Sequence, residues 1–300
     1  MDLSALAPFW IVFSLLSAFF HASRIAVTKH LSFSFSARAL TLYVNLASLV
    51  VTAPLVIWHH DVPLHEPVYI AVVLLGGLVS GIGGWALNSA IGRSDVSLVG
   101  PVMTLTPAFV VVIEWSVIGD LPSGLGLVGL ALLVAGGYVL SVEREQTSPF
   151  APLKRLFTDP GSVLTLVAAF CFAAASTLGR VGIQMSDPLS FAVVVAVVNP
   201  VVLFVMFSVQ DHRFYREAFP RHLRREIRPL LLLGVLFALM RIADQIALSL
   251  ALASYVMAVK RSAGMFSVLL GHWYYGEGHL IARLAGSAVM LAGLFVLTQS

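Results

Sequence analysis

The feature that most constrains this chain is a series of ten apolar segments that follow one another along almost the whole sequence. A helix rises 1.5 Å per residue, so about 20 apolar residues cross the hydrocarbon core of a bilayer. Hydrophobic residues make up 59% of the chain and charged residues only 11%, whereas soluble domains carry about 25% charged residues. The sequence therefore predicts an all-α integral membrane protein with ten transmembrane helices.

The predicted spans are joined by short connections, so no soluble catalytic domain fits. The first span lacks a basic n-region and is too long for the core of a signal peptide, which predicts a retained helix. The single cysteine, Cys171, excludes an intramolecular disulfide framework. The ten spans are approximately Pro8–Thr28, Ala37–Trp58, Val68–Ile91, Ser97–Ile118, Gly124–Val142, Ser162–Gln184, Pro188–Val209, Pro229–Leu250, Ser254–Tyr275 and His279–Leu297.

The loop charges predict an orientation, because cytoplasmic loops carry the excess of Lys and Arg. Alternate loops are basic, and the loops between them contain neither residue. We therefore predict a protein of a bacterial-type plasma (inner) membrane, with both termini outside the cytoplasm. The net charge of +3 reflects this topology and does not imply nucleic-acid binding. The basic loops hold Lys29, Arg38, Arg93, Arg144, Lys154, Arg155, Arg213, Arg216, Arg221, Arg224, Arg225 and Arg228.

The chain also contains an internal repeat. It divides into a first five-helix repeat (1–142), a cytoplasmic linker (143–160) and a second five-helix repeat (161–300). Because each half crosses the membrane an odd number of times, the two halves must be inverted relative to each other. The alignment places Gly119-Asp120 on Gly276-Glu277, Ser97 on Ser254, Gly77 on Gly234, Asn88 on Gln245, Gly129 on Gly286 and Gly136 on Gly293.

Inverted repeats are typical of secondary transporters, whose binding site lies where Pro or Gly interrupts corresponding helices. Here Pro101 and Pro107 in the fourth span correspond to Ala258 and Gly264 in the ninth. Pro107 has no N–H to bond the carbonyl of Met103, which we expect to be free for another partner.

Two adjacent cations, Lys260 and Arg261, lie inside the ninth span. A charged side chain within hydrocarbon costs roughly 2.5 kcal/mol or more, so such residues usually face a polar cavity. Arg offers a planar fork for phosphate or carboxylate, and Lys adds a compact point charge. Gly264, at i+4 and i+3 from the pair, would leave space for both to reach one anion. Alternatively, the pair neutralises Asp244 or Glu114, or snorkels outward.

The eighth span places Arg241, Asp244 and Gln245 on one face. This spacing allows an ion pair between Arg241 and Asp244. Asp244 is a candidate proton carrier or ligand for a substrate amine, or else a structural counter-ion. Asn88 either lines the cavity or bonds across helices.

Three further charged residues lie within spans. Glu114, near the predicted outer end of the fourth span, is a gate or a solvated end residue. Arg24 and Arg180 are related by the repeat and lie near opposite membrane faces. Snorkelling and symmetric gating both fit these two arginines.

Several motifs resemble a known family. The fourth span reads Pro101-Val-Met-Thr-Leu-Thr-Pro107 and closes on Gly119-Asp120, and the ninth reads Ala258-Val-Lys-Arg261 and closes on Tyr274-Tyr-Gly-Glu277. With the duplicated ten-helix layout, these features resemble the drug/metabolite transporter superfamily, EamA-type permeases in particular. In a related branch, the plastid triose-phosphate translocators, a similarly placed Lys-Arg pair binds substrate phosphate, which implies an anion-binding role for Lys260 and Arg261. Better-known members place both termini in the cytoplasm, opposite to the loop charges here.

Together these observations predict a secondary active transporter that exports or exchanges a small polar metabolite with an anionic group, an organophosphate or organic acid. An amino-acid exporter is an alternative, with the zwitterion between Lys260/Arg261 and Asp244. A lipid-phosphate flippase and, less favoured, a membrane enzyme on lipid phosphates are further alternatives. A proton is a candidate coupling ion. No cofactor, metal or catalytic residue is predicted.

Overall fold

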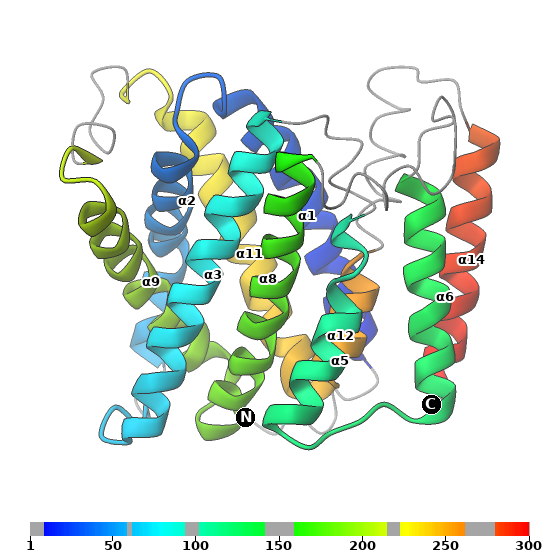
Figure 1. Cartoon of the computed structure of the whole chain (residues 1–300). Coiled ribbons are helices and arrows are strands. Elements are labelled where there is room, and N and C mark those ends of the chain that lie inside the picture. The colour runs from blue at the N-terminus through cyan, green and yellow to red at the C-terminus, as the bar shows by residue number, and fades with distance from the viewer. Residues whose placement is uncertain are drawn as a thin grey trace.

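The computed structural model describes residues 9–58, 62–93, 102–141, 159–214, 223–261 and 280–299. Its regular elements are all helices, most of which run side by side between two faces (Figure 1). The start of α1 and the end of α14 lie at the same face (Figure 1). The elements are α1 Trp10–Leu31, α2 Ala37–Thr52, η2 Ala53–Trp58, α3 Pro67–Arg93, α5 Thr106–Val117, α6 Gly124–Ser141, α8 Pro160–Met185, α9 Pro188–Gln210, α11 Ile227–Leu250, α12 Ala253–Lys260 and α14 Leu280–Thr298.

The predicted all-helical, multi-pass class is confirmed, and each predicted span contains a helix. Within the described residues, six helices are long and apolar enough to cross a membrane: α1, α2 with the start of η2, α3, α8, α9 and α11. Four predicted spans are represented by shorter helical segments, α5, α6, α12 and α14. For α5 and α12, parts of the predicted spans (97–101 and 262–275) lie outside the described residues.

Two of the long helices begin at an Asp-Pro pair. The Asp159 carboxylate accepts a hydrogen bond from the Ser162 N–H (2.7 Å) at the start of α8. Asp187 does the same for Leu189 and Ser190 at the start of α9 (both 3.0 Å). In each case a proline occupies the first helical position, where an N–H would have no partner within the helix. These caps explain why both helices begin where the apolar pattern starts.

Pro107 lies in the first turn of α5, which begins at Thr106. The carbonyl of Met103, expected to be free, instead accepts a hydrogen bond from the Thr106 hydroxyl (2.7 Å). A hydroxyl next to the proline thus replaces the N–H that proline lacks. The sequence expectation of an interrupted helix holds at this point, but the freed carbonyl has a local partner.

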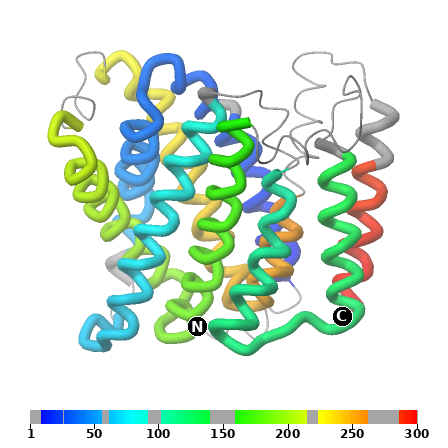
Figure 2. The backbone as a smooth tube through the Cα atoms, in the orientation of Figure 1, coloured from blue at the N-terminus to red at the C-terminus, as the bar shows by residue number. Residues whose placement is uncertain are grey.

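The helices pack as a bundle with one attached pair. Extensive contacts join α3 to α8 and α1 to α11, and α2 and α9 complete this part of the bundle. The short helices α5 and α12 pack on each other, on α8 and, for α12, on α1. The pair formed by α6 and α14 stands at one side and contacts the rest through α12 (Figure 2). The short helix α12 therefore lies between the main bundle and this pair.

Glycines allow α6 and α14 to approach backbone to backbone. A Cβ atom at Gly136 would lie 2.7 Å from the Met290 nitrogen and 2.8 Å from the Gly286 oxygen. A Cβ atom at Gly129 would lie 3.0 Å from the Gly293 oxygen. Backbone atoms cannot rotate away as a side chain can, so these positions require glycine for steric reasons.

We expect Gly136→Ala to destabilise the protein by about 1–3 kcal/mol, because the added methyl group must separate α6 from α14. The measurement is the apparent melting temperature of the purified protein in detergent. Gly124→Ala is the matched control, since a Cβ atom there meets nothing within 4 Å. Its melting temperature should stay the same or rise slightly. Equal melting temperatures for the two variants would contradict the close packing.

Candidate functional site

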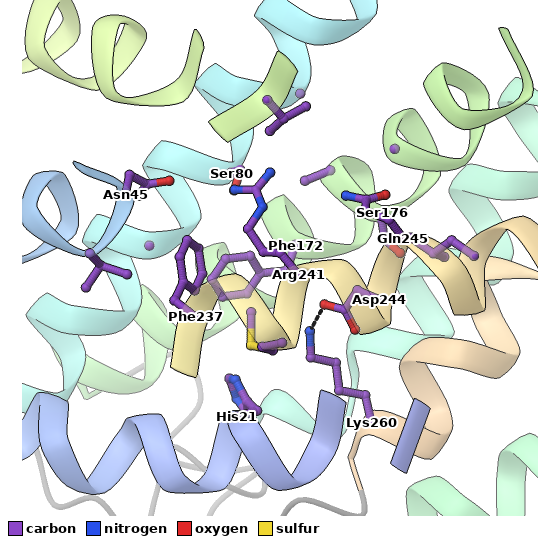
Figure 3. A pocket seen from close by; sticks show the side chains of 18 of the residues that line it. His21, Asn45, Ser80, Phe172, Ser176, Phe237, Arg241, Asp244, Gln245 and Lys260 are labelled. Carbon is purple, nitrogen blue, oxygen red and sulfur yellow. Dashed lines mark hydrogen bonds and ion pairs between the residues drawn. The ribbon is translucent and has the colours of Figure 1, made fainter. Parts of the chain in front are cut away.

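A cavity of about 160 Å³ lies among α1, α2, α3, α8, α9, α11 and α12 (Figure 3). It is similar in size to the ~150 Å³ engineered cavity that admits benzene, so a small metabolite fits. Its apolar lining includes Phe172, Phe191 and Phe237. Its charged and polar lining residues are His21, Arg24, Thr41, Asn45, Ser80, Asn88, Ser176, Arg241, Asp244, Gln245 and Lys260.

Lys260 and Asp244 form an ion pair at this cavity (Figure 3). Lys260 is the last residue of α12 and is only 6% exposed, and Asp244 comes from α11. The Lys260 Nζ donates to Asp244 Oδ2, and the Ser17 hydroxyl of α1 donates to Oδ1. Three helices therefore meet at one carboxylate. The pairing with Asp244 considered from the sequence is the arrangement adopted in this structure.

Arg241 does not form the expected ion pair with Asp244, whose oxygens bond Lys260 and Ser17 instead. Its guanidinium lies over the ring of Phe237, 5.4 Å from the centroid. Arg24 lies over the same ring at 5.3 Å. The two arginines, from α11 and α1, are thus held at the cavity by one aromatic side chain (Figure 3 shows Arg241 and Phe237).

Two amide side chains related by the proposed repeat also line the cavity. The Asn88 amide donates to the Thr41 hydroxyl (2.8 Å), which joins α3 to α2. Gln245 is buried, and its Oε1 has no hydrogen-bond partner. An unpartnered buried acceptor at a cavity wall is available to a ligand donor.

Some residues at or next to the cavity were not predicted as binding residues, although a sequence signal existed for several. Ser17, His21 and Arg24 lie at i, i+4 and i+7 on α1, which places a polar stripe on an otherwise apolar helix. Phe237 lies four residues before Arg241 on α11, on the same face. Ser80 and Ser176 gave no signal, because isolated serines are common in membrane helices.

The remaining predicted binding residues are placed differently. Arg261 follows α12 directly and is half-buried with its Nε unpartnered, but it does not line the cavity. Consecutive helical residues point about 100° apart, so neighbours in sequence need not share a site. Gly264 and Pro101 lie outside the described residues. In the described part of the chain, no group of three or more His, Cys, Asp or Glu residues could hold a metal ion.

Glu114 belongs to a separate cluster of charged residues. Its side chain is completely buried and bonds Arg180 Nη1 at 2.6 Å. The same nitrogen of Arg180 bonds Asp120 at 2.8 Å. Arg180 therefore does not snorkel, and Glu114 is not solvated. Arg24, its proposed repeat partner, lies at the cavity without a comparable ion pair among the described residues.

The Glu114 carboxylate also holds the start of α12. It accepts hydrogen bonds from the backbone N–H groups of Ala253 (2.8 Å) and Ser254 (3.1 Å). These are donors that a helix leaves unpaired at its first turn, where the helix dipole also favours a negative charge. Since α12 has only eight residues, about 12 Å of helix connects this anchor to Lys260. The Glu114 cluster thus helps to position Lys260.

Several membrane-length helices define the chain as a multi-pass membrane protein, and these helices enclose a cavity with charged lining residues. Residues 8–142 match the EamA-like transporter family. This family is a member of the drug/metabolite transporter superfamily, so the match over residues 8–142 confirms the resemblance found in the sequence. Its members are transporters of the drug/metabolite type rather than enzymes.

The fold has a close counterpart among solved structures. A chain titled "Crystal structure of protein" superposes with a TM-score of 0.72 over 98% of this chain and 97% of that chain. The two sequences are 18% identical, so the likeness concerns the fold alone. No curated protein matches this chain.

We expect Glu114→Ala to lower stability by about 2–5 kcal/mol, because it leaves the Ala253 and Ser254 N–H groups unpaired and removes one of the two carboxylates on Arg180. Glu114→Gln should lose less, since its amide oxygen still accepts a hydrogen bond. Melting temperatures in detergent provide the measurement.

The matched control for this prediction is Glu66→Ala. Glu66 has a half-exposed side chain next to His65, so its loss should change stability by less than about 0.5 kcal/mol. A Glu114→Ala variant that melts with the wild type would mean that the cluster does not anchor α12.

Proposed function

We propose that the chain is a secondary active transporter that exports or exchanges a small polar metabolite carrying an anionic group, an organophosphate or organic acid. The observation that carries this proposal is the buried cavity lined by Arg24, Arg241 and Lys260 with Asp244 as its one lining carboxylate among the described residues. Cations enclosed by helices are costly unless they meet a partner, so an excess of cations favours an anionic ligand.

Lys260 is the proposed primary anion-binding residue. Its present partner, Asp244, is held on the other side by Ser17, so a ligand oxygen can approach the ammonium beside the carboxylate. Asn88 and Gln245 supply neutral hydrogen-bonding groups that would orient the rest of the ligand. Arg261, at the end of α12, adds positive charge near this site without lining it.

Alternating access in many secondary transporters is the motion of one repeat against the other, and the packing supports an inverted repeat of 1–142 and 161–300 joined by the 143–160 linker. The repeat pairs α1 with α8, α2 with α9, α3 with α11, α5 with α12, and α6 with α14. Under this exchange the contact of α3 with α8 corresponds to that of α11 with α1, and both occur. The contacts of α5 with α8 and of α12 with α1 correspond in the same way.

The glycine contacts support the same symmetry at residue level. Gly129 approaches Gly293 and Gly136 approaches Gly286, so aligned glycines exchange partners across the antiparallel α6–α14 pair. A Cβ atom at Gly77 on α3 would meet Asn199 of α9. At the aligned Gly234 on α11, it would meet Ala47 of α2. The family match to residues 8–142 also ends where we place the end of the first half.

We assign a gating role to the cluster of Glu114, Arg180 and Asp120. It joins α5, α8 and the start of α12 near the face where α1 begins and α14 ends (Figure 1). Opening that face requires α12 to move relative to α5 or α8, and the same motion displaces Lys260. Pro107, in the first turn of α5, and Arg24, on the cavity side of α1, are further proposed hinge and gate positions.

The proposed location is a bacterial inner membrane with both termini outside the cytoplasm. Lys29 near the end of α1, Arg38 in α2 and Arg228 in α11 lie at helix ends on the face opposite the start of α1 (Figure 1). Arg213, just after α9, lies at the same face. Their positive charge supports a cytoplasmic position for that face.

Asp244 favours a second candidate, an amino-acid exporter. Its carboxylate would accept the ligand ammonium while Lys260 receives the ligand carboxylate, since both side chains line one cavity. A zwitterion adds no net charge, so this candidate leaves the excess of cavity cations uncompensated. We therefore place it second.

The test is a thermal-shift screen of the purified protein with organic acids, phosphate monoesters and zwitterionic amino acids. A ligand at 100 times its Kd raises stability by about 2.7 kcal/mol. We expect an anionic class to give the shift and Lys260→Gln to abolish it. The double variant Lys260→Gln/Asp244→Asn, which removes both charges of this ion pair together, should fold and also fail to respond.

Arg38→Gln is the matched control, because it also removes one cation but lies at a partly exposed ion pair with Asp211. It should keep the full ligand response. Persistence of that response in the double variant would overturn the assignment of Lys260, and a response restricted to amino acids would favour the second candidate.

A further inference from the structure

Two cations of the cavity remain after Lys260 is paired with Asp244. Arg24 on α1 and Arg241 on α11 both line the cavity. Among the described residues, neither makes a hydrogen bond or an ion pair, and the Arg24 Nε is buried without a partner. Their charges and donors are therefore available to a molecule in the cavity.

Phe237 holds both guanidinium groups in place. Their centres lie 5.3 Å (Arg24) and 5.4 Å (Arg241) from the centroid of this ring. A cation–π contact fixes a guanidinium through its charge and its face, and leaves the N–H groups at its edge unused. Two arginines restrained in this way present donors from two helices, which is an arrangement suited to an acidic group.

The charge balance of the cavity indicates how many negative charges its ligand carries. The lining contains three cations and one carboxylate, which leaves two positive charges in excess when His21 is neutral. A monovalent anion would leave one of them uncompensated, and a zwitterion would leave both. A divalent anion compensates both, which matters where little water screens the charges.

The spacing of residues along α11 indicates that the positive charges of the cavity lie at two separate places, so that one acidic group of a ligand would compensate each. Arg241 and Asp244 are three residues apart, which is a rise of about 4.5 Å on one face of the helix. The Lys260 ammonium lies at Asp244, and both guanidinium groups lie at Phe237, seven residues before Asp244 on the same helix. Two acidic groups on a short carbon skeleton match this arrangement, and the cavity volume limits the ligand to a small molecule.

We propose that Arg24 and Arg241, held by Phe237, form a second anion subsite, so that the ligand is a small divalent acid with one acidic group at the arginines and the other at Lys260. This inference rests on the proposed transport function and specifies its substrate class. Phe237 acts as a positioning residue, because it contacts the arginines and fixes where their donors point.

The test measures binding of matched probes to the full-length protein in detergent by titration calorimetry. Succinate and butyrate have the same carbon skeleton length, but succinate carries two carboxylates. We expect the wild type to bind succinate at least about tenfold more tightly, the factor that ~1.4 kcal/mol gives. Arg24→Gln and Arg241→Gln should each lose most of this preference, because each removes part of the subsite for the second carboxylate.

Three further variants test whether the preference for succinate depends on the two cavity arginines and on Phe237. Arg38→Gln removes a cation outside the cavity and should keep the preference for succinate. Arg24→Lys keeps the charge but removes the fork, so it should retain part of the preference and also serves as a folding control. Phe237→Leu keeps both arginines, and a reduced succinate preference in this variant would support the positioning role.

A further probe separates total charge from spacing. Glycerol 3-phosphate carries its two charges on one phosphoryl group, and weaker binding than that of succinate would support two separate subsites. Equal binding of succinate and butyrate by the wild type, or a full succinate preference in both arginine variants, would overturn the second subsite. If succinate binding depends on Lys260 but not on the arginines, this inference fails and the proposed function stands. If none of the three probes binds, the second subsite is overturned, and the wider thermal-shift screen decides the proposed function separately.

Discussion

The carboxylate of Glu114 anchors the short helix on which the proposed site depends. It is completely buried, and it is bonded by Arg180 and by two backbone N–H groups at the start of α12. In a bilayer, a helix end without such partners would leave several polar groups unpaired at a cost of several kcal/mol each. This one residue therefore makes it possible for α12 to begin inside the bundle and to carry Lys260 to the cavity.

The charged residues at the cavity and those in the Glu114 cluster differ in how completely they are paired. In the cluster, one arginine has two carboxylates, and the arrangement is locally satisfied. At the cavity, the described lining residues include three cations and one carboxylate, and two of these cations lie over one aromatic ring without an ion pair to another described residue. A structural cluster needs complete pairing, whereas a binding site gains affinity from groups that the protein itself leaves incompletely paired. This contrast supports a structural or gating role for the first and a ligand-binding role for the second.

Much of the fold could be predicted from the sequence, but less of the site. The apolar segments and the Asp-Pro caps at 159–160 and 187–188 depend on local chemistry, and the helices begin close to the predicted limits. Lys260, Asp244 and Gln245 were predicted to share a site, and they line one cavity. The spacing along one helix allowed an Arg241–Asp244 pair, but Lys260 and Ser17 from other helices bond the carboxylate instead.

The sequence by itself determined the class of the protein and the positions of its helices, because a bilayer leaves no solvent for backbone groups and each apolar segment must pair them internally. It also determined which charged residues are enclosed by apolar helices. Only the tertiary structure decided which of them meet: Glu114 reaches the N–H groups of α12 from 139 and 140 residues away. Likewise, Lys260 faces the cavity and its neighbour Arg261 does not. Such partners depend on how helices pack and rotate, which the pattern along one helix cannot determine.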